Sequence, residues 1–363
     1  MKKKVLFVLP HMTGGGAERV TAILANKLVD KNCEVHIHTL ITDDSFYYLR
    51  PEIKQSSDGV SVNRRNKITL LFSESFGFIK SMFSVLHKIK SEKYDIVISF
   101  FIETDVIVYL CKILGCNFME VHSERNDPWQ RSKMFKKIRC HIYKKCDKLV
   151  CQSKAVSDYF DFVEMGKKYI ISNPIDKEKI PDRIAKHSKK IVSVARLFEQ
   201  KNYPLLIKSF SLVCNEFPGY TLNIYGDGIL YDSLLKMINE LNLNERVFLH
   251  GAKKNVMKLI SDAELFIMSS NYEGFPNALL EAMAIGIPVI STDFQTGVAR
   301  ELIGDDNGIV VPVNDEMAMS SAIRTMLNDY EKMLEMGYCN RKKCEQFYTD
   351  KIIEKWIEAL EIE

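Results

Sequence analysis

The feature that most constrains the fold is an alternation of short apolar strands and amphipathic helical segments that starts twice along the chain. The strand segments are rich in β-branched residues and apolar on both faces, which predicts strands buried between two layers of helices. This alternation is typical of a parallel sheet. In the first half we predict strands at residues 4–9, 34–40, 96–101, 118–121, 148–151 and 169–171.

The alternation pauses at a charged segment that contains Pro174 and Pro181, which we interpret as a linker ending near residue 188. It then restarts, with helices predicted at 203–217, 231–241 and 276–285 and strands at 190–194, 221–225, 247–249, 265–268 and 288–291. The chain is long enough for two domains. We therefore predict two doubly wound α/β domains, at 1–175 and 176–345, that face each other across a cleft.

Composition excludes several classes of protein. The net charge of +3 gives no general argument for nucleic-acid binding. Nine cysteines without a CxxC pair lack zinc-site spacing, so no metal site is predicted and a reducing compartment is favoured. The apolar run 5–9 stops at Pro10 and is too short for a signal peptide or a membrane span. We expect a cytoplasmic protein.

The clearest site signal is the segment Glu273-Gly-Phe-Pro-Asn-Ala-Leu-Leu-Glu281, which directly follows a predicted strand. Pro276 suits the first turn of a helix, where its missing N–H would be unpaired anyway. The backbone N–H groups of that turn would suit an anion such as a diphosphate, and they belong to Asn277, Ala278 and Leu279. Glu281 would then lie within reach of a ribose and Glu273 nearer to a sugar. Alternatively, the two glutamates are solvated surface charges.

Arg196 and Lys201 follow the predicted strand 190–194, on a loop expected to face the cleft. Breaking a glycosidic bond to a nucleoside diphosphate leaves negative charge that must be neutralised. Many sugar transferases use an Asp-x-Asp pair and a divalent ion for this, and the chain contains no Asp-x-Asp. A guanidinium and an ammonium can do the same electrostatic work.

Three further features lie at predicted strand ends. Gly14-Gly15-Gly16 follows the first strand and lacks both the dinucleotide and the P-loop patterns, but it allows close approach of a ligand. Gly226 offers the same freedom after another strand, where Asp227 could instead cap the next helix. His122 should lie at the rim of the cleft.

A basic segment at 131–148 has apolar residues interleaved at helical spacing. It is either a solvated helix face or a helix that lies on an anionic membrane. The candidate membrane-facing residues are Lys133, Lys136, Lys137 and Arg139.

Taken together, these motifs resemble glycosyltransferase family 4, a group of retaining enzymes with the GT-B fold, over nearly the whole chain. The resemblance rests on Gly14–Arg19, His122, Asn173-Pro-Ile-Asp176, Ala195-Arg196 with Lys201-Asn202, Tyr225-Gly-Asp-Gly228, and Glu273 with Glu281. It implies two Rossmann-like domains, no metal or other cofactor, and a last helix, at about 346–363, that packs back on the first domain. We expect that helix to run continuously from about 341 to 360.

The resemblance also implies roles for the residues. Arg196 and Lys201 would bind the donor diphosphate, Glu281 the ribose and Glu273 the transferred sugar, while His122 would contact the sugar or acceptor. Further donor-binding residues would be Gly15, Gly16, Gly226, Gly274, Phe275, Asn277, Ala278 and Leu279. Glu301 is a candidate from a loop in which Val298 replaces the proline that the family often has.

The subgroup that the chain resembles builds bacterial surface polysaccharides and lipid-linked oligosaccharides. This implies a UDP-linked hexose or N-acetylhexosamine donor, a glycan or polyprenyl-diphosphate-linked acceptor, and action at the inner face of the cell membrane. Two alternatives remain open: a UDP-sugar 2-epimerase on the same scaffold, and a non-catalytic partner subunit.

Overall fold

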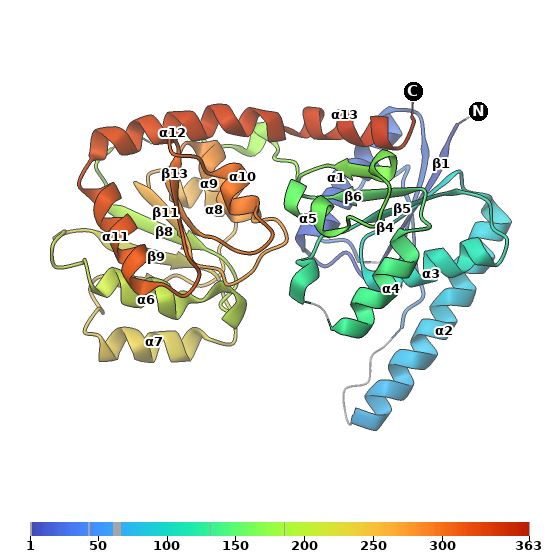
Figure 1. Cartoon of the computed structure of the whole chain (residues 1–363), viewed down its shortest axis with the longest axis horizontal. Coiled ribbons are helices and arrows are strands. Elements are labelled where there is room, and N and C mark those ends of the chain that lie inside the picture. The colour runs from blue at the N-terminus through green and yellow to red at the C-terminus, as the bar shows by residue number, and fades with distance from the viewer. Residues whose placement is uncertain (1, 43, 61–66, 131, 185, 363) are drawn as a thin grey trace. The chain divides into compact units, whose positions relative to one another are not determined.

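The computed structural model describes residues 2–362 except 43, 61–66, 131 and 185, and for 67–76 it describes the backbone alone. The chain divides into two compact units (Figure 1). Unit 1 comprises residues 1–174 and 349–363, and unit 2 comprises residues 175–348. The sequence placed this boundary one residue later and the return to the first domain about three residues earlier.

Unit 1 is built on a seven-stranded parallel sheet in the order β3-β2-β1-β4-β5-β6-β7. The strands are β1 (Lys4–Leu9), β2 (Glu34–Thr39), β3 (Lys54–Ser57), β4 (Ile96–Ser99), β5 (Met119–Ser123), β6 (Lys148–Cys151) and β7 (Lys168–Ile170). In β1, residues Val5 to Leu9 have no exposed surface. Apolar side chains on both faces of a strand require helices on both sides of the sheet.

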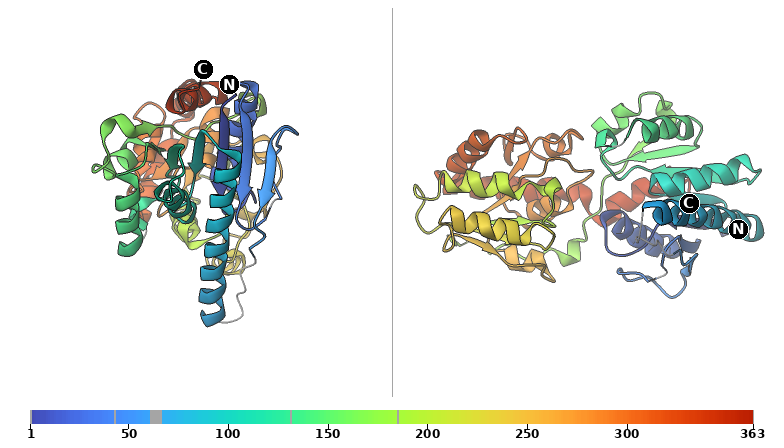
Figure 2. Two further views of the ribbon diagram at one scale, coloured as in Figure 1. Left: turned by 90° about the vertical axis from the view of Figure 1, so that its right-hand side faces the viewer. Right: turned by 90° about the horizontal axis from the view of Figure 1, so that it is seen from below.

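The helices of unit 1 are α1 (Gly16–Asp30), α2 (Lys67–Glu92), α3 (Ile102–Ile113), α4 (Lys133–Tyr143), α5 (Lys154–Tyr159) and α13 (Thr349–Ala359). Helices α2, α3 and α4 pack in succession, and α1 packs against α13. The two ends of the chain lie side by side in this unit (Figure 2), where Lys3 Nζ donates to the carbonyl of Glu361.

Unit 2 has a six-stranded parallel sheet in the order β10-β9-β8-β11-β12-β13. The strands are β8 (Lys190–Val194), β9 (Thr221–Tyr225), β10 (Val247–Leu249), β11 (Leu265–Met268), β12 (Val289–Thr292) and β13 (Gly308–Val311). Chain order reverses between the neighbours β8 and β11. Ligands of doubly wound sheets bind outside the carboxyl ends of the strands at such a point.

The helices of unit 2 pack in two groups that contact each other, and the first group covers most of the large apolar core of the unit. One group contains α6 (Tyr203–Ser211), α7 (Tyr231–Glu240) and α11 (Glu316–Leu327). The other contains α8 (Val256–Ile260), α9 (Asn277–Ile285) and α12 (Tyr330–Cys344), and the short α10 (Val298–Leu302) follows β12.

The expected continuous helix at 341–360 is wrong. Helix α12 ends at Cys344, a 3₁₀ turn covers Glu345–Phe347, and Tyr348 leaves helical geometry with ψ 143°. At this break the Phe347 carbonyl accepts a hydrogen bond of 2.8 Å from the Ile175 N–H, so backbone pairing replaces a turn of helix.

Candidate active site

The loops after β8 and β11 are joined by hydrogen bonds at the carboxyl edge of the unit 2 sheet. Asn271 N donates to the Gln200 carbonyl over 2.8 Å, and Gln200 Nε2 donates to the Tyr272 carbonyl over 2.8 Å. Ser269 Oγ donates to the Lys201 carbonyl over 2.8 Å. The backbone that carries Lys201 is therefore fixed against the backbone that leads to Glu273.

Lys201 and Glu273 form an ion pair between these two loops. Their side chains are 15% and 7% exposed, so the pair is largely withdrawn from water. Ser270 Oγ also donates to Glu273 Oε1 over 2.6 Å, and Gln200 Nε2 donates to Oε2 over 3.3 Å. Both carboxylate oxygens are thus held, and a ligand of Lys201 would lie beside Glu273.

Helix α9 begins at Asn277, four residues after Glu273. Pro276 directly precedes the helix with φ −84° and ψ 84°, close to an inverse γ-turn. The Asn277 N–H donates to the Phe275 carbonyl over 3.1 Å, so its predicted availability for an anion is wrong. The N–H groups of Ala278 and Leu279 lie in the first turn, where the helix offers them no carbonyl partner.

The other residues of this motif differ in exposure. Phe275 is buried and its ring lies 6.3 Å from that of Phe347, so its side chain contributes packing. Gly274 is half-buried. Glu281 is half-buried in the second turn of α9.

Arg196 lies on the same loop as Lys201 and is exposed, with its guanidinium 5.3 Å from the centre of the Phe198 ring. Gly226 lets the loop after β9 press on this segment, because a Cβ there would lie 1.8 Å from the Ala195 carbonyl oxygen. The lack of a side chain at Gly226 therefore allows the close approach of these two loops, and this role does not depend on a contact with a nucleotide. Asp227 does not cap α7: its carboxylate accepts from the Gly228 N–H over 2.8 Å.

In unit 1, the glycine-rich loop joins β1 to α1. Gly14 has φ +110°, a conformation that favours glycine, and Gly15 and Gly16 lead into the helix. A Cβ on Gly15 would lie 2.2 Å from the buried Glu18 carboxylate, which contacts His11 Nδ1 at 3.1 Å. The loop can hold no larger residue at Gly15 without moving Glu18.

The expectation that His122 lies at an accessible rim is wrong. Its side chain has no exposed surface, and its ring nitrogens face Asp105 Oδ1 at 3.1 Å and Glu120 Oε1 at 2.9 Å. Burial lowers the pKa of this imidazole, but the two carboxylates outweigh it and raise the pKa to about 10. Alternate residues of the parallel strand β5 point to two helix-covered faces, and neither is open. His122 is therefore a buried histidine that pairs with two carboxylates, Asp105 and Glu120. A contact between His122 and a sugar stays a prediction.

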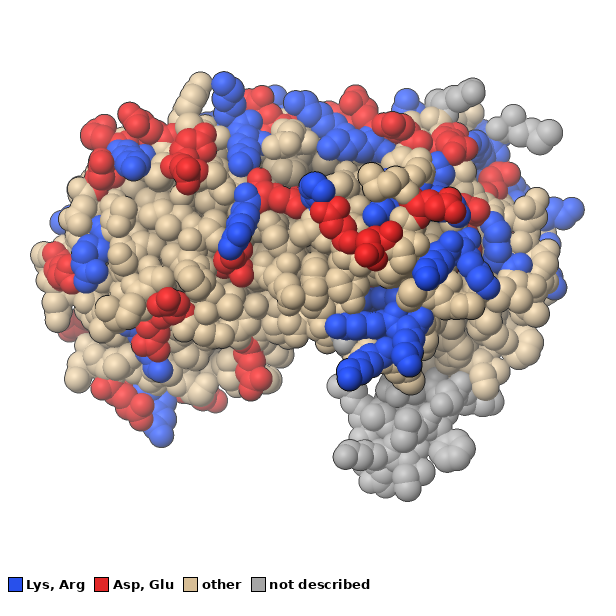
Figure 3. Space-filling view, viewed as in Figure 1, with Lys and Arg blue, Asp and Glu red and all other residues tan. Residues whose placement is uncertain are grey.

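Helix α4 carries the predicted basic face, and Figure 3 shows basic side chains gathered over it. Lys133 and Lys137 are exposed and Lys136 is half-buried. Arg139 is 2% exposed and pairs with Glu124 at 3.1 Å, so its assignment as membrane-facing is wrong. Arg139 lies on the face of α4 that packs against the rest of unit 1, opposite the exposed lysines. Arg131 lies outside the described residues.

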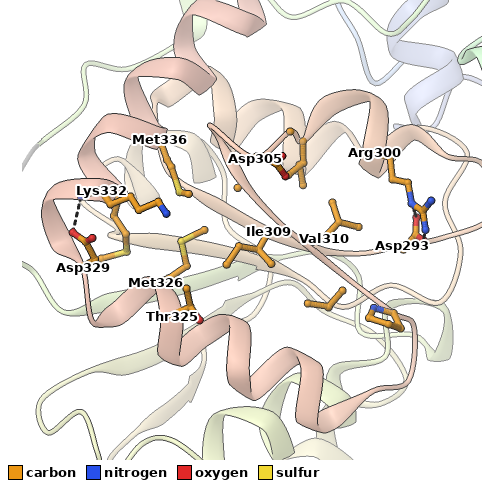
Figure 4. A pocket seen from close by; sticks show the side chains of 16 residues that line it. Asp293, Arg300, Asp305, Ile309, Val310, Thr325, Met326, Asp329, Lys332 and Met336 are labelled. Atoms are coloured by element: carbon orange, nitrogen blue, oxygen red, sulfur yellow. Dashed lines mark hydrogen bonds and ion pairs between the residues drawn. The ribbon is translucent and has the colours of Figure 1, made fainter.

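A cavity of about 570 Å³ opens along β13, away from these residues (Figure 4). Met326 and Met336 line it, and an ion pair between Arg300 and Asp293 lies at one end. None of the predicted donor-binding residues lines it. Glu301 is exposed on the neighbouring helix α10 and does not line the cavity.

Sequence reasoning missed the residues that hold Glu273 in place. Ser270, Gln200 and Asn271 make the hydrogen bonds described above, and Thr292 Oγ1 donates to the Ser270 carbonyl over 2.6 Å. The available signal was a run of polar residues directly after a fully apolar strand, Ser269-Ser-Asn271. Within the described residues, no cluster of three or more His, Cys, Asp or Glu is arranged to bind a metal. The same part of the chain contains no helix able to span a membrane.

Two units that each carry a doubly wound parallel sheet define the fold class as GT-B. Family models agree: residues 14–179 match Glycosyltransferase Family 4, and residues 174–343 match Glycosyl transferases group 1. The chain belongs to glycosyltransferase family 4 and is a glycosyltransferase, which confirms the predicted family and fold.

Relatives span the chain. It is 31% identical, over 97% of both chains, to the N-acetylgalactosamine-N,N'-diacetylbacillosaminyl-diphospho-undecaprenol 4-alpha-N-acetylgalactosaminyltransferase of Campylobacter jejuni. It is 26% identical, over 98% of both chains, to an alpha-1,4-N-acetyl-D-galactosaminyltransferase of the same organism whose name gives the acceptor as GalNAc-alpha-(1->4)-GalNAc-alpha-(1->3)-diNAcBac-PP-undecaprenol. A protein from Anabaena solved with UDP shares the fold, with a TM-score of 0.80 at 18% identity over 99% of this chain and 100% of that one.

Proposed function

We propose that this enzyme transfers a hexose or N-acetylhexosamine from a UDP-sugar to a sugar on polyprenyl diphosphate or a related glycan, with retention of anomeric configuration. The observation that carries the proposal is the Lys201–Glu273 pair at the start of α9. It gives adjacent positions for a negative diphosphate and a neutral, hydroxyl-rich sugar.

The diphosphate is stabilised by Arg196, Lys201 and the N-terminus of α9. Arg196 is exposed and can move to a ligand, while Lys201 is fixed by Glu273 and by its loop. The first-turn N–H groups of Ala278 and Leu279 add partial positive charge. Because these groups supply the neutralising charge and the sequence has no Asp-x-Asp, we propose transfer without a metal ion or other cofactor.

Donor and acceptor are proposed from the relatives. Two relatives of full length transfer N-acetylgalactosamine to undecaprenyl-diphosphate-linked sugars by their names, and a structural neighbour was solved with UDP. A UDP-N-acetylhexosamine and a lipid-linked acceptor in bacterial surface polysaccharide synthesis are therefore the first pair to test.

Retention is proposed to proceed on one face of the sugar. The acceptor oxygen attacks C1 from the side on which the C1–O bond to the β-phosphate breaks, and a phosphate oxygen takes the acceptor proton. The Glu273 side chain is 7% exposed and both of its oxygens are held, so it is suited to bind sugar hydroxyls and is a poor nucleophile. The α linkage in the names of both relatives requires retention if the donor is α-linked.

We further propose a peripheral position at the inner face of the cell membrane. The exposed Lys133 and Lys137 of α4 carry this proposal together with the exposed Met134 between them. Each basic residue near an anionic surface adds about 1 kcal/mol of binding.

The test is to incubate the enzyme with UDP-N-acetylgalactosamine, with and without a polyprenyl-diphosphate-linked N-acetylhexosamine, in EDTA. Acceptor-dependent UDP release and an α-configured product by NMR are expected. UDP release or C2 epimerisation without acceptor would favour the epimerase. Absence of UDP binding by calorimetry would favour the non-catalytic partner subunit.

A further inference from the structure

The loop after β2 exposes two aromatic side chains, and one of them, Phe46, lies at the carboxyl edge of the unit 1 sheet. Phe46 is 74% exposed and Tyr48 is 76% exposed. Single exposed apolar residues are common on protein surfaces. Phe46 is unusual because it lies beside the glycine-rich loop, at the edge where parallel sheets bind ligands.

This loop is held in place by the glycine-rich loop and by α1. Ser45 forms a parallel bridge with Met12, and the Phe46 N–H donates to the Met12 carbonyl over 2.9 Å. Tyr47 Oη donates to the Gly15 carbonyl over 3.0 Å, and Asn26 Nδ2 donates to the Tyr48 carbonyl over 3.0 Å. The backbone around Phe46 is therefore ordered, which lowers the entropy lost when a ligand binds there.

The Phe46 ring lies over Gly14. A Cβ on Gly14 would lie 3.3 Å from the ring, so the ring is supported on one side by backbone. The Tyr47 ring meets it edge-on, with centroids 5.2 Å apart and planes at 85°. Support from both neighbours limits the rotation of Phe46 while most of its surface stays in water.

We propose that Phe46 is an acceptor-binding platform on which one sugar ring of the acceptor glycan stacks. A pyranose with axial hydroxyls on one face presents C–H bonds on the other, and these pack on the negative face of an aromatic ring. The proposal rests on the proposed function, because it assigns the acceptor of that reaction to this loop.

Charge favours a sugar over a lipid surface at this position. Residues 40–52 contain Asp43, Asp44 and Glu52 against the lone basic Arg50, a net charge of −2. Arg50 is itself paired with Asp30 and Glu52. An acidic loop is repelled by anionic lipid, whereas an uncharged glycan meets no such barrier.

The test compares Phe46→Ala, Phe46→Leu and Phe46→Tyr with wild type and with Tyr338→Ala, which removes an aromatic side chain that is 72% exposed in unit 2. Phe46→Leu keeps apolar area and loses the flat face. We expect the acceptor KM to rise at least tenfold in the Ala and Leu variants and to stay within about twofold in the Tyr and Tyr338→Ala variants. UDP affinity by calorimetry should be unchanged in all four.

Saturation-transfer NMR with methyl α-N-acetylgalactosaminide and methyl α-N-acetylglucosaminide tests the platform without turnover. We expect wild-type protein to saturate the C–H protons of one sugar face, and the Ala and Leu variants to lose that signal. Full signal or an unchanged acceptor KM in Phe46→Ala would overturn the proposal. A membrane contact predicts a different pattern: Phe46→Ala would no longer sediment with phosphatidylglycerol vesicles, Phe46→Leu still would, and the acceptor KM would not change. That pattern would overturn the proposal. A wild-type protein that binds the sugar but transfers none would reject the proposed function alone.

Discussion

Replacing Lys201 by alanine should lower both the free energy of unfolding and kcat, because Lys201 pairs with Glu273 and is proposed to bind the donor diphosphate. In the free enzyme, the substitution leaves the Glu273 carboxylate buried without its ion-pair partner. Removing one partner of a buried pair costs about 3–5 kcal/mol. Ser270 and Gln200 still donate to this carboxylate, so we expect about 2–3 kcal/mol.

A loss of that size should lower the melting midpoint of a unit of this length by about 5–10 °C. Catalysis should fall further, since the ammonium would no longer neutralise the leaving diphosphate. Losing such a group typically costs about 3 kcal/mol in the transition state, or at least a hundredfold in kcat.

The matched control is Lys236→Ala, which removes an exposed lysine of α7 that pairs with Glu240 on the surface. The double variant K201A/E273Q separates the two effects, because a neutral amide removes the unpaired charge. We expect it to regain most of the stability and none of the activity, as measured by calorimetry and UDP release. Equal melting midpoints and equal kcat for K201A and K236A would refute this reasoning.

Three further predictions concern other parts of the chain. Arg139→Ala should destabilise the protein by about 2–3 kcal/mol in guanidinium unfolding, because Glu124 loses its guanidinium partner and keeps only weaker hydrogen bonds, such as those from Asn126 N and Tyr143 Oη. Lys133→Ala/Lys137→Ala should instead reduce sedimentation with anionic vesicles and leave the unfolding midpoint unchanged, and the reverse pattern would contradict the account of α4. The pKa of His122 is raised to about 10 in the folded state, against about 6.5 in the unfolded state. Its contribution to the free energy of unfolding is therefore complete below pH 6.5 and falls by up to about 1.4 kcal/mol per pH unit as pH rises to 10. His122→Gln should flatten this pH dependence of stability, and an unchanged slope would contradict the assignment. Gly226→Ala should weaken UDP binding and lower the melting midpoint through its clash with Ala195, while Gly166→Ala, which meets nothing within 4 Å, should do neither.

The fold was largely predictable because hydrophobic patterning reports burial directly. Strands such as β1, β6 and β11 are short apolar runs bounded by polar residues, and their predicted limits agree with the structure. The edge strand β3, with the polar sequence Lys-Gln-Ser-Ser, has no such pattern and was missed. The break at Tyr348 was missed because it depends on backbone pairing with Ile175, a residue far away in sequence.

The site was predictable in its residues and less so in their contacts. Strand–turn–helix context pointed to Arg196, Lys201 and Glu273, but it could not show that Lys201 and Glu273 form an ion pair with each other. It also could not separate Arg139 from its exposed neighbours, since the buried face of a basic helix is set by the carboxylate it meets, here Glu124. The burial of His122 depends likewise on Asp105, which lies on another element.

The central claim is that Arg196, Lys201 and the start of α9 hold the diphosphate of the donor in place of a divalent ion. Calorimetric titration of UDP and of uridine, in EDTA, into wild type, Arg196→Ala, Lys201→Ala and the control Lys236→Ala tests it most directly. We predict that both site variants bind UDP at least tenfold more weakly, with uridine affinity and the control unchanged. UDP binding that is equal in all four proteins, or that appears only when Mg²⁺ or Mn²⁺ is added, would contradict the claim.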